Sequence, residues 1–362
     1  MKLTLEQQNL THVLTKVASI VEKRNTIPIL ANVMLSATGD KLTVTASDLD
    51  IEITASTSAT VEREGKTTVN ADVFLSFVKK LAKGKSVDLE LDNHKLHITS
   101  GKTTSALATL DADTFPQMAT SEYDNSLTIQ SDTLVDVFNR TAFAMSTEET
   151  RYYLNGVYLH NVDGALVGVS TDGHRLAKSV VDGAGDVSPI IVPRKTVTEL
   201  RKLLAEGGDV TLDTSATKLR VTCGDFVLVS KVIDGTFPDY TRVIPKEGGR
   251  IANIDAKAFR AAIDRVVVLS DDRARGVSLA VSAGKLVVSV NSATGDAVDE
   301  VEIDYQGEAF ECGFNSKYLN EVAAQADNGS LRVSFGVGPT DPALITPDEQ
   351  DGAVYVVMGM RV

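Results

Sequence analysis

The chain is organised by a threefold internal repeat with a period of about 120 residues, which is a normal domain size. A first anchor, two short apolar runs separated by a turn, recurs at 32–44, 156–167 and 276–287. A second anchor opens an apolar segment at 69–72, 192–195 and 314–317, and Thr-Phe-Pro occurs at 114–116 and 236–238. The constant register predicts three homologous domains in the 362-residue chain, at 1–122, 123–245 and 246–362.

Each repeat shows the same order of elements. An apolar stripe at helical spacing comes early, as in Leu10, Val13 and Leu14, and a second stripe follows, as in Phe74 and Val78. Runs that alternate apolar and polar residues have the period of half-buried strands, at 87–91, 301–305 and 331–335. Short turns of Gly, Asp and Asn favour antiparallel pairing. We therefore predict an α+β fold in which two helices pack on antiparallel sheet in each of three domains.

The distribution of charge matters more than its sum. The net charge of −13 by itself argues against a nucleic acid partner, because phosphate contacts require Lys and Arg. The six helix-centred segments nevertheless carry a net positive charge in total, so the acidic residues gather elsewhere. One interpretation is that helices simply favour Lys and Arg near their C-termini. The other is that the helices form one positive surface facing an anionic ligand, with the strands outside.

Several classes of protein find no support in the sequence. No glycine-rich phosphate loop follows a strand, so nucleotide binding is not indicated. The two cysteines, Cys223 and Cys312, exclude a disulfide scaffold and a cysteine zinc site, and they fit a reducing cytoplasm. No apolar run reaches the roughly 18 residues of a membrane helix. Residues 1–10 lack the apolar core of a signal peptide, so we expect a cytoplasmic protein without membrane association.

The histidines raise two alternatives. His94 and His97 lie in an alternating region, where solvated strand residues are favoured over a metal site. The run Asp172-Gly173-His174 looks like part of an acid–base pair, but Asp and His in a glycine turn more often make turn hydrogen bonds than a catalytic triad. No G-x-S-x-G elbow lies nearby, so hydrolysis is disfavoured.

Two further segments suggest contact surfaces. Residues 355–362 stay apolar almost to the end, which fits either a terminal core strand or an adaptable groove that accepts a peptide. Residues 237–245 fit a linker stiffened by proline. A linker that carries Phe, Tyr, Val and Ile must nevertheless pack on something.

Five motifs spread over the chain carry a resemblance to a known family: RYYLNG at 151–156, TDGHRLA at 171–177, VPRK at 192–195, FPDYTRVIP at 237–245 and YVVMGMR at 355–361. In these motifs the chain resembles the bacterial DNA polymerase III beta subunit, the replicative sliding clamp. The resemblance implies a DNA-clamp fold and a homodimeric ring, with helices lining the hole and strands forming the shell. It implies that the ring encircles duplex DNA and tethers the replicative polymerase and other DNA-processing proteins, which confers processivity.

The same resemblance implies no enzymatic activity, no cofactor and no metal. The implied partners are double-stranded DNA without sequence preference, the alpha subunit of the replicative polymerase, the clamp loader, repair and translesion polymerases, and a second copy of the chain. The alternative is a static peptide-binding scaffold with no DNA in the ring. Such a scaffold would show no salt-dependent effects of DNA.

The resemblance also assigns a peptide-binding cleft between the second and third domains. Its residues by family position are Leu154, Thr171, Gly173, His174, Arg175, Leu176, Pro238, Arg242, Val243, Val356, Met358, Met360, Arg361 and Val362. We expect the apolar members to bury a peptide's apolar end, with His174 and Arg175 at the rim. The family commonly has Pro at 359 and Leu at 362, so Gly359 and Val362 are expected to loosen or shrink the edge of the cleft.

Residues for DNA and for the dimer follow in the same way. The resemblance implies that DNA faces Arg24, Tyr152, Tyr153, Arg194 and Lys195, and composition alone adds Lys79, Lys80, Arg201 and Lys202. Glu148 and Glu149 lie near the tyrosine pair, where an acid would weaken phosphate contact. By family position, Val268 and Leu269 of the third domain insert against the first domain near Leu107 in a head-to-tail dimer.

Overall fold

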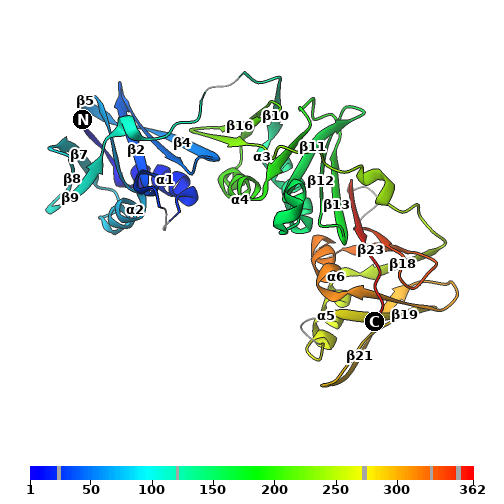
Figure 1. Ribbon diagram of the computed structural model, residues 1–362. Helices are drawn as coiled ribbons and strands as arrows, with labels where there is room; N and C mark the ends of the chain where they lie inside the picture. The colour runs from blue at the N-terminus through cyan, green and yellow to red at the C-terminus, as the bar shows by residue number, and fades with distance from the viewer. Residues whose placement is uncertain (23–25, 120–121, 271–274, 327–328, 348–351) are drawn as a thin grey trace. The chain divides into compact units, whose positions relative to one another are not determined.

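The structure is a computed structural model that describes residues 1–22, 26–119, 122–270, 275–326, 329–347 and 352–362. Figure 1 shows the course of the chain, whose internal contacts divide it into two compact units. Unit 1 comprises Met1–Val135 and Asp186–Val232, and unit 2 comprises Asp136–Gly185 and Ile233–Val362. The middle repeat therefore contributes to both units, and its helix α3 (Ser131–Thr141) crosses the boundary.

Unit 1 is built on one antiparallel sheet in the order β10-β15-β16-β17-β4-β3-β2-β6-β9-β8-β7-β1-β5. Its strands are β1 (Lys2–Glu6), β2 (Asn32–Thr38), β3 (Lys41–Ser47), β4 (Ile51–Ser58), β5 (Thr60–Arg63), β6 (Gly65–Asn70), β7 (Ser86–Asp92), β8 (Lys95–Ser100), β9 (Thr103–Leu110), β10 (Asn125–Gln130), β15 (Asp209–Thr214), β16 (Lys218–Cys223) and β17 (Phe226–Lys231). Its helical segments are α1 (Gln7–Val17), η1 (Ala18–Ile20), η2 (Pro28–Ala31), α2 (Ala71–Lys80), η3 (Ala112–Thr114), α4 (Arg194–Leu203) and η6 (Leu204–Glu206), and β14 (Ile190–Pro193) precedes α4.

Unit 2 has a second antiparallel arrangement, in the order β11-β12-β13-β25-β24-β23-β18-β21-β20-β19-β22. Its strands are β11 (Gly156–Val162), β12 (Ala165–Thr171), β13 (Arg175–Val181), β18 (Arg250–Asp255), β19 (Gly276–Ser282), β20 (Lys285–Ser292), β21 (Gly295–Asp304), β22 (Phe310–Asn315), β23 (Ser330–Phe335), β24 (Ala343–Thr346) and β25 (Ala353–Val357). Its helical segments are η4 (Ala142–Ala144), η5 (Glu149–Leu154), η7 (Tyr240–Val243), α5 (Ala256–Val267), α6 (Ser316–Ala323) and η8 (Ala324–Ala326).

The predicted helical stripes are the buried faces of real helices. In α1 the side chains of Leu10, Val13 and Leu14 are fully buried, and in α2 so are Phe74 and Val78. Burial of such a side chain stabilises the fold by about 1.5–3 kcal/mol. In unit 1, α1 packs on β4 and against α2, and in unit 2, α5 packs on β21 and against α6. The repeat thus places a helix pair on a sheet in each unit.

The anchors of the repeat mark the starts of elements. Helix α2 begins after Asn70, whose side chain accepts a hydrogen bond from the N–H of Val73, and α6 begins after Asn315, which accepts from Lys317. Such caps satisfy an N–H that the helix itself leaves unpaired and contribute about 1 kcal/mol. The first anchor forms the hairpins β2–β3, β11–β12 and β19–β20. The strands expected at 87–91, 301–305 and 331–335 are β7, the end of β21, and β23.

One strand assignment was wrong in detail. His94 lies in the turn between β7 and β8 with φ of +60°, so it is not an alternating strand residue, whereas His97 lies in β8. Both side chains are exposed. Among the residues that the structure describes, no cluster of His, Cys, Asp and Glu is placed to hold a metal ion. No helix in the described part of the chain is long and apolar enough to cross a membrane.

Each unit contains a strand in the interior of its sheet order that is paired on only one side along most of its length. Residues 103–108 of β9 pair with β8 on one side, and β9 meets β6 only through Thr109 and Leu110. Residues 295–302 of β21 pair with β20, and β21 meets β18 only through Ile303 and Asp304. Within the described ranges, the outer edges of both stretches have no partner strand. An open edge of this kind is a template for pairing with another strand.

Candidate peptide-binding and DNA-binding sites

The turn at 171–175 is closed by its own polar groups. Asp172 Oδ1 accepts hydrogen bonds from the backbone N–H groups of His174 (2.9 Å) and Arg175 (3.0 Å). Thr171 Oγ1 accepts from the N–H of Gly173 (3.1 Å) and donates to the carbonyl of Arg175 (2.6 Å). Gly173 has a backbone φ of +88°, a value that residues other than glycine rarely adopt. Asp172 therefore shapes a turn, as expected, and does not orient His174 for catalysis.

Arg175 does not lie at an exposed rim, and that expectation was wrong. Its side chain is only 6% exposed. The guanidinium lies over the rings of Tyr318 (4.5 Å) and Phe143 (5.3 Å). It donates to Asp172 Oδ2 (3.1 Å), to Glu321 Oε2 and to the Phe143 carbonyl (2.5 Å). Two carboxylates offset the cost of burying the charge, so Arg175 joins β13 to α6 as an internal cross-link.

The end of the chain divides into a core strand and an exposed tail. Strand β25 pairs with β13, which sets Val356 opposite Leu176. Both side chains are buried, at 2% and 1% exposure, so they can form only the floor of a site and not its open wall. Leu154, at the end of η5, is likewise buried. The interpretation of a terminal core strand is therefore confirmed for residues 355–357, whereas Met358 (42%) and Val362 (64%) beyond it are exposed.

The tail at 358–362 is held by its backbone. The N–H of Met358 donates to the carbonyl of His174 (2.9 Å), and the N–H of Met360 donates to that of Gly313 (2.8 Å). Gly359 lies so close to the loop at 340–341 that a Cβ would stand 2.6 Å from the Thr340 carbonyl carbon. Val362 lies directly on Gly313, because a Cβ on Gly313 would stand 2.6 Å from the side chain of Val362. Small residues thus allow the tail to lie directly on the domain surface.

The segment 237–245 packs through its aromatic residues Phe237 and Tyr240, in agreement with the expectation that so apolar a linker must pack on something. Phe237 and Tyr240 are buried, whereas Pro238, Arg242 and Val243 are exposed. Arg242 pairs with Asp239 (2.8 Å). In the described chain, no hydrogen bond or ion pair links Pro238, Arg242 or Val243 to the tail. The strand pairing brings 171–176 together with 356–358, but it does not bring this third group into bonded contact with them.

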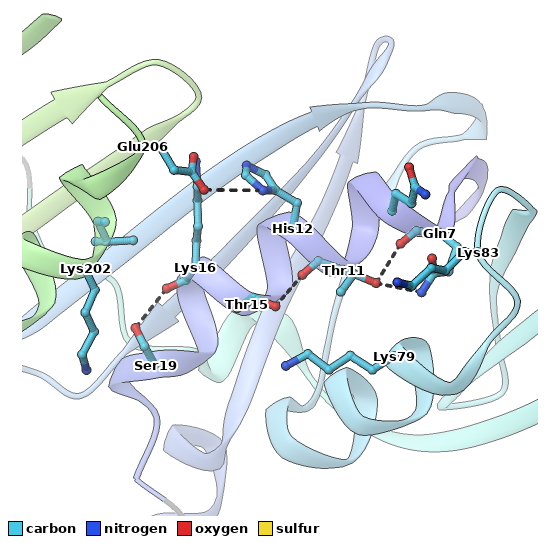
Figure 2. A pocket seen from close by; sticks show the side chains of 12 residues that line it. Gln7, Thr11, His12, Thr15, Lys16, Ser19, Lys79, Lys83, Lys202 and Glu206 are labelled. Atoms are coloured by element: carbon cyan, nitrogen blue, oxygen red, sulfur yellow. Dashed lines mark hydrogen bonds and ion pairs between the residues drawn. The ribbon is translucent and has the colours of Figure 1, made fainter. Parts of the chain in front are cut away.

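A basic groove of about 680 Å³ lies between α1, α2 and the α4–η6 turn of unit 1 (Figure 2). Lys79 enters it from the α2 side and Lys202 from the α4 side, while Lys83 lies near Gln7 at the end of the groove away from Lys202. Lys202 pairs with Glu199 (2.9 Å). Lys79 and Lys83 are exposed and make no ion pair with any residue that the structure describes. The groove thus brings together Lys79 and Lys202, two of the residues suggested by composition.

The floor of this groove is neutralised by acidic groups. Lys16 Nζ pairs with Asp225 (3.0 Å) and Glu206 (3.1 Å), and His12 lies 3.8 Å from the same two carboxylates. Burial alone would lower the pKa of Lys16, but the hydrogen bonds that its ammonium donates to Asp225 and Glu206 raise that pKa above its usual value. Lys16 is therefore a structural cation that joins α1 to η6 and the β16–β17 turn.

Other predicted DNA residues have different surroundings. Lys195 pairs with Asp48 (2.5 Å) and Glu22 (3.2 Å), and although burial acts to lower its pKa, these hydrogen bonds raise it. Lys195 is thus engaged within unit 1 rather than free for phosphate. Lys80 and Arg201 are exposed, Arg194 is half-buried, and Arg24 lies outside the described residues.

The tyrosine pair lies in η5 of unit 2. The rings of Tyr152 and Tyr153 meet edge to face with centroids 5.8 Å apart, and Tyr152 is 54% exposed. Glu148 is paired with Arg151 (3.5 Å), which tempers the negative charge near the rings. Gly235 leaves room for the pair, because a Cβ there would stand 3.1 Å from Tyr153.

Three family models match the chain in order: the DNA polymerase III beta subunit N-terminal domain at 1–119, the central domain at 128–239 and the C-terminal domain at 241–361. The chain belongs to the DNA polymerase III beta subunit family. It is a sliding clamp with three clamp domains.

Relatives and solved structures agree with this assignment. The chain is 42% identical over 373 residues to the beta sliding clamp of Caulobacter vibrioides and 32% identical over 371 residues to that of Escherichia coli, with all of each chain covered. A crystal structure of the sliding clamp from Bartonella birtlesii, bound to griselimycin, matches with a TM-score of 0.96 at 38% identity. The Pseudomonas aeruginosa beta subunit matches with a TM-score of 0.96 at 34% identity, and both structures cover 100% of both chains.

Sequence reasoning missed several residues of the clamp that the structure brings to these sites. Lys83 follows Lys79 at helical spacing, so its place in the groove could have been predicted from that spacing. Tyr318, whose ring stacks on His174 with centroids 6.4 Å apart, and Glu321 lie on α6. Nothing local in the sequence indicates that these two reach Arg175, because the contact depends on how β13 and α6 pack.

The residues expected at a dimer interface lie where a second chain could reach them. Leu107 is half-buried on β9, beside the open edge of that strand. Val268 follows α5 and is 79% exposed. Leu269 is half-buried, and its carbonyl accepts a hydrogen bond from Ser292 Oγ (2.6 Å). Val268 therefore does not belong to the buried stripe of α5, which ends at Val266 and Val267.

Proposed function

We propose that this clamp acts as a homodimeric ring on duplex DNA, which it holds through phosphate contacts without sequence preference. The observation that carries the DNA part is the basic groove of unit 1. Lys79 and Lys83 are exposed and unpaired among the described residues of a chain with a net charge of −13. A cluster of unpaired lysines on helices of an acidic protein suits an anionic ligand.

The ring rests on the two open strand edges. Residues 103–108 of β9 and 295–302 of β21 could pair with each other, since each stretch offers backbone N–H and C=O groups without a partner strand along one side. Head-to-tail pairing of β9 in one chain with β21 in another would satisfy both edges and close after two subunits. The exposed Val268 and the neighbouring Leu269 would add apolar contact beside that seam, facing Leu107 of the other copy.

The dimer has a direct test. Val268→Ala combined with Leu269→Lys should yield monomers in sedimentation velocity at micromolar concentration, because the pair loses apolar burial and gains a buried charge. The matched control is Val337→Lys, since Val337 is equally exposed (81%) but lies elsewhere. A variant at 268–269 that sediments as the parent does would contradict the placement of the interface.

We further propose that the tail 358–362 and the turn 171–174 form the wall of a peptide-binding site for the polymerase, the clamp loader and repair polymerases. Exposed Met358 beside His174 supports this, because methionine adapts to varied apolar partners. Leu176 and Val356 would supply the floor. A few buried side chains, less the cost of ordering the peptide, give an affinity in the micromolar range, about −8 kcal/mol.

Because the proposed sites contain only binding surfaces, we infer that the clamp performs no covalent chemistry and needs no cofactor. Because duplex DNA is its proposed partner, we infer that it acts in the cytoplasm. None of the relatives favours the alternative considered from the sequence, a static peptide-binding scaffold, and that scaffold would differ from a clamp in one measurable respect. Only a clamp with DNA in its ring responds to the loss of helix lysines and to salt.

The experiment compares clamp retention on circular and linear duplex DNA at several salt concentrations. Lys79→Ala with Lys83→Ala should weaken retention on circles and reduce the slope of log affinity against log salt by about 2, because each lysine that no longer neutralises a phosphate lowers the slope by about 1. The control is Lys66→Ala, an exposed lysine on β6 away from the groove. Equal effects of groove and control variants, or retention that is independent of salt, would favour the scaffold.

A further inference from the structure

An aromatic column anchors the segment that follows β17 to the sheet of unit 2. The ring of Phe237 stacks on Tyr158 at 4.9 Å and 8°, and Tyr158 stacks on His160 at 4.4 Å and 16°. The ring of Tyr240 then meets His160 edge to face at 5.6 Å. Tyr158 and His160 are two apart on β11, so they lie on the same face of the strand.

A buried hydrogen bond completes the column. His160 Nε2 lies 3.0 Å from the hydroxyl of Tyr240, and the two residues are 8% and 7% exposed. Burial, together with the charge of Lys178, lowers the pKa of His160 to about 4, so the ring is neutral at physiological pH. A hydrogen bond in such a buried place stabilises the contact between the two rings, and a hydroxyl left there without a partner would be costly.

The anchored segment carries Pro238, Arg242 and Val243, three residues that the family resemblance places in the peptide-binding cleft. Phe237 and Tyr240 flank Pro238, and Tyr240 opens the short helix η7 that contains Arg242 and Val243. Asp239 stiffens this turn by accepting from the Thr241 N–H (3.3 Å) and hydroxyl (2.6 Å). The turn is rigid in itself, while Pro238, Arg242 and Val243 are exposed and gain no burial from the sheet. Their position therefore depends on Phe237 and Tyr240.

The strand that holds the column belongs to the same sheet as the tail. In unit 2, β11 is followed by β12, β13 and β25, and the tail 358–362 continues from β25. A displacement of Tyr240 from His160 would move Val243 relative to Met358 without disturbing any strand. The tail 358–362 and the segment with Pro238, Arg242 and Val243 are thus both attached to the same sheet. The tail is attached through β25, and the segment is attached through the contact of Tyr240 with His160 on β11.

We propose that His160 is a positioning residue for peptide binding, which acts by holding Tyr240 and hence the segment with Pro238, Arg242 and Val243. This inference rests on the proposed peptide-binding function. His160 itself touches no peptide. Its contribution is to keep the exposed segment at a fixed distance from the tail, so that a peptide does not have to order that segment on binding.

The test uses the full-length dimer and a fluorescein-labelled peptide taken from the clamp-binding segment of the replicative polymerase. Tyr240→Phe removes only a hydroxyl, and His160→Phe keeps a stacking ring without the nitrogen. Each should weaken peptide binding about fivefold, which corresponds to one buried hydrogen bond. The double variant should lose no more than either single variant, because both remove the same interaction. His160→Gln, which can still reach the hydroxyl, should recover part of the affinity.

Two controls separate the possible failures. Met360→Ala alters the tail directly, so unchanged binding in this variant would mean that the proposed site itself is wrong. If Met360→Ala weakens binding while Tyr240→Phe and His160→Phe retain native affinity, the positioning role is refuted. Losses that add in the double variant would also refute it. Retention on circular DNA should be unchanged in the His160 and Tyr240 variants, which a general loss of folding would not allow.

Discussion

Acidification should lower the free energy of unfolding of unit 2 through protonation of His160, and the difference between the unfolded and folded pKa values of this residue determines by how much. The ordinary pKa of histidine is 6.5, and burial together with the charge of Lys178 lowers the pKa of His160 to about 4 in the folded chain. Between these values the unfolded chain binds a proton that the folded chain does not. Above about pH 7 His160 is neutral in both states, so it does not reduce the free energy of unfolding. That free energy falls as the pH drops through 6.5, and the decrease levels off near pH 4, where the folded chain also binds the proton.

The magnitude follows from the two pKa values. From pH 7.5 to pH 5.0, a histidine with pKa values of 6.5 unfolded and about 4 folded loses about 2 kcal/mol of folding free energy. The groups that face His160 are Tyr158, Tyr240 and Lys178, and none of them titrates in this range in the ordinary way. The loss in this window is consequently assigned to the imidazole alone.

The assay is urea unfolding of the wild type and of His160→Phe at pH 7.5 and 5.0, followed by circular dichroism. Other titrating groups are common to both proteins, so the difference between the two pH dependences isolates His160. The variant should lose about 2 kcal/mol less than the wild type on acidification. A histidine-selective NMR titration should find one ring that stays neutral well below pH 6. Parallel pH dependences, or five histidines that all titrate near 6.5, would refute the reasoning.

Two further predictions concern the same unit. Deleting 358–362 should abolish binding of the polymerase-derived peptide yet leave a folded dimer, because the core strand β25 ends at Val357 and is retained. Circular dichroism and sedimentation would expose the opposite outcome, an unfolded third domain. Glu321→Gln should destabilise the clamp by about 2–4 kcal/mol in urea, because Arg175 then keeps a buried charge with only one carboxylate. Glu148→Gln breaks the exposed pair with Arg151 and should cost less than about 1 kcal/mol, and equal losses would contradict the role of Arg175.

Much of the architecture could be predicted from local pattern. Helix faces follow from side-chain spacing, as the buried positions of α1 and α2 illustrate. Helix starts follow from caps such as Asn70 and Asn315, because a cap acts within three residues of its own position. The Asp172 turn could be predicted for the same reason. These features depend on neighbours in the chain, so the sequence alone contains the information that decides them.

The environment of charged residues was decided only by the tertiary structure. Arg175 belongs to a motif that suggested an exposed rim, yet Glu321 and Tyr318 of a distant helix enclose it. Lys195 looked available for DNA, yet it pairs with Asp48 and Glu22 of the first repeat. Spacing along the chain says nothing of such partners, because strand pairing and helix packing bring them within a few ångströms. A charge is free or neutralised according to those contacts, and this is why the repeat and the family could be derived from sequence while the state of each cation could not.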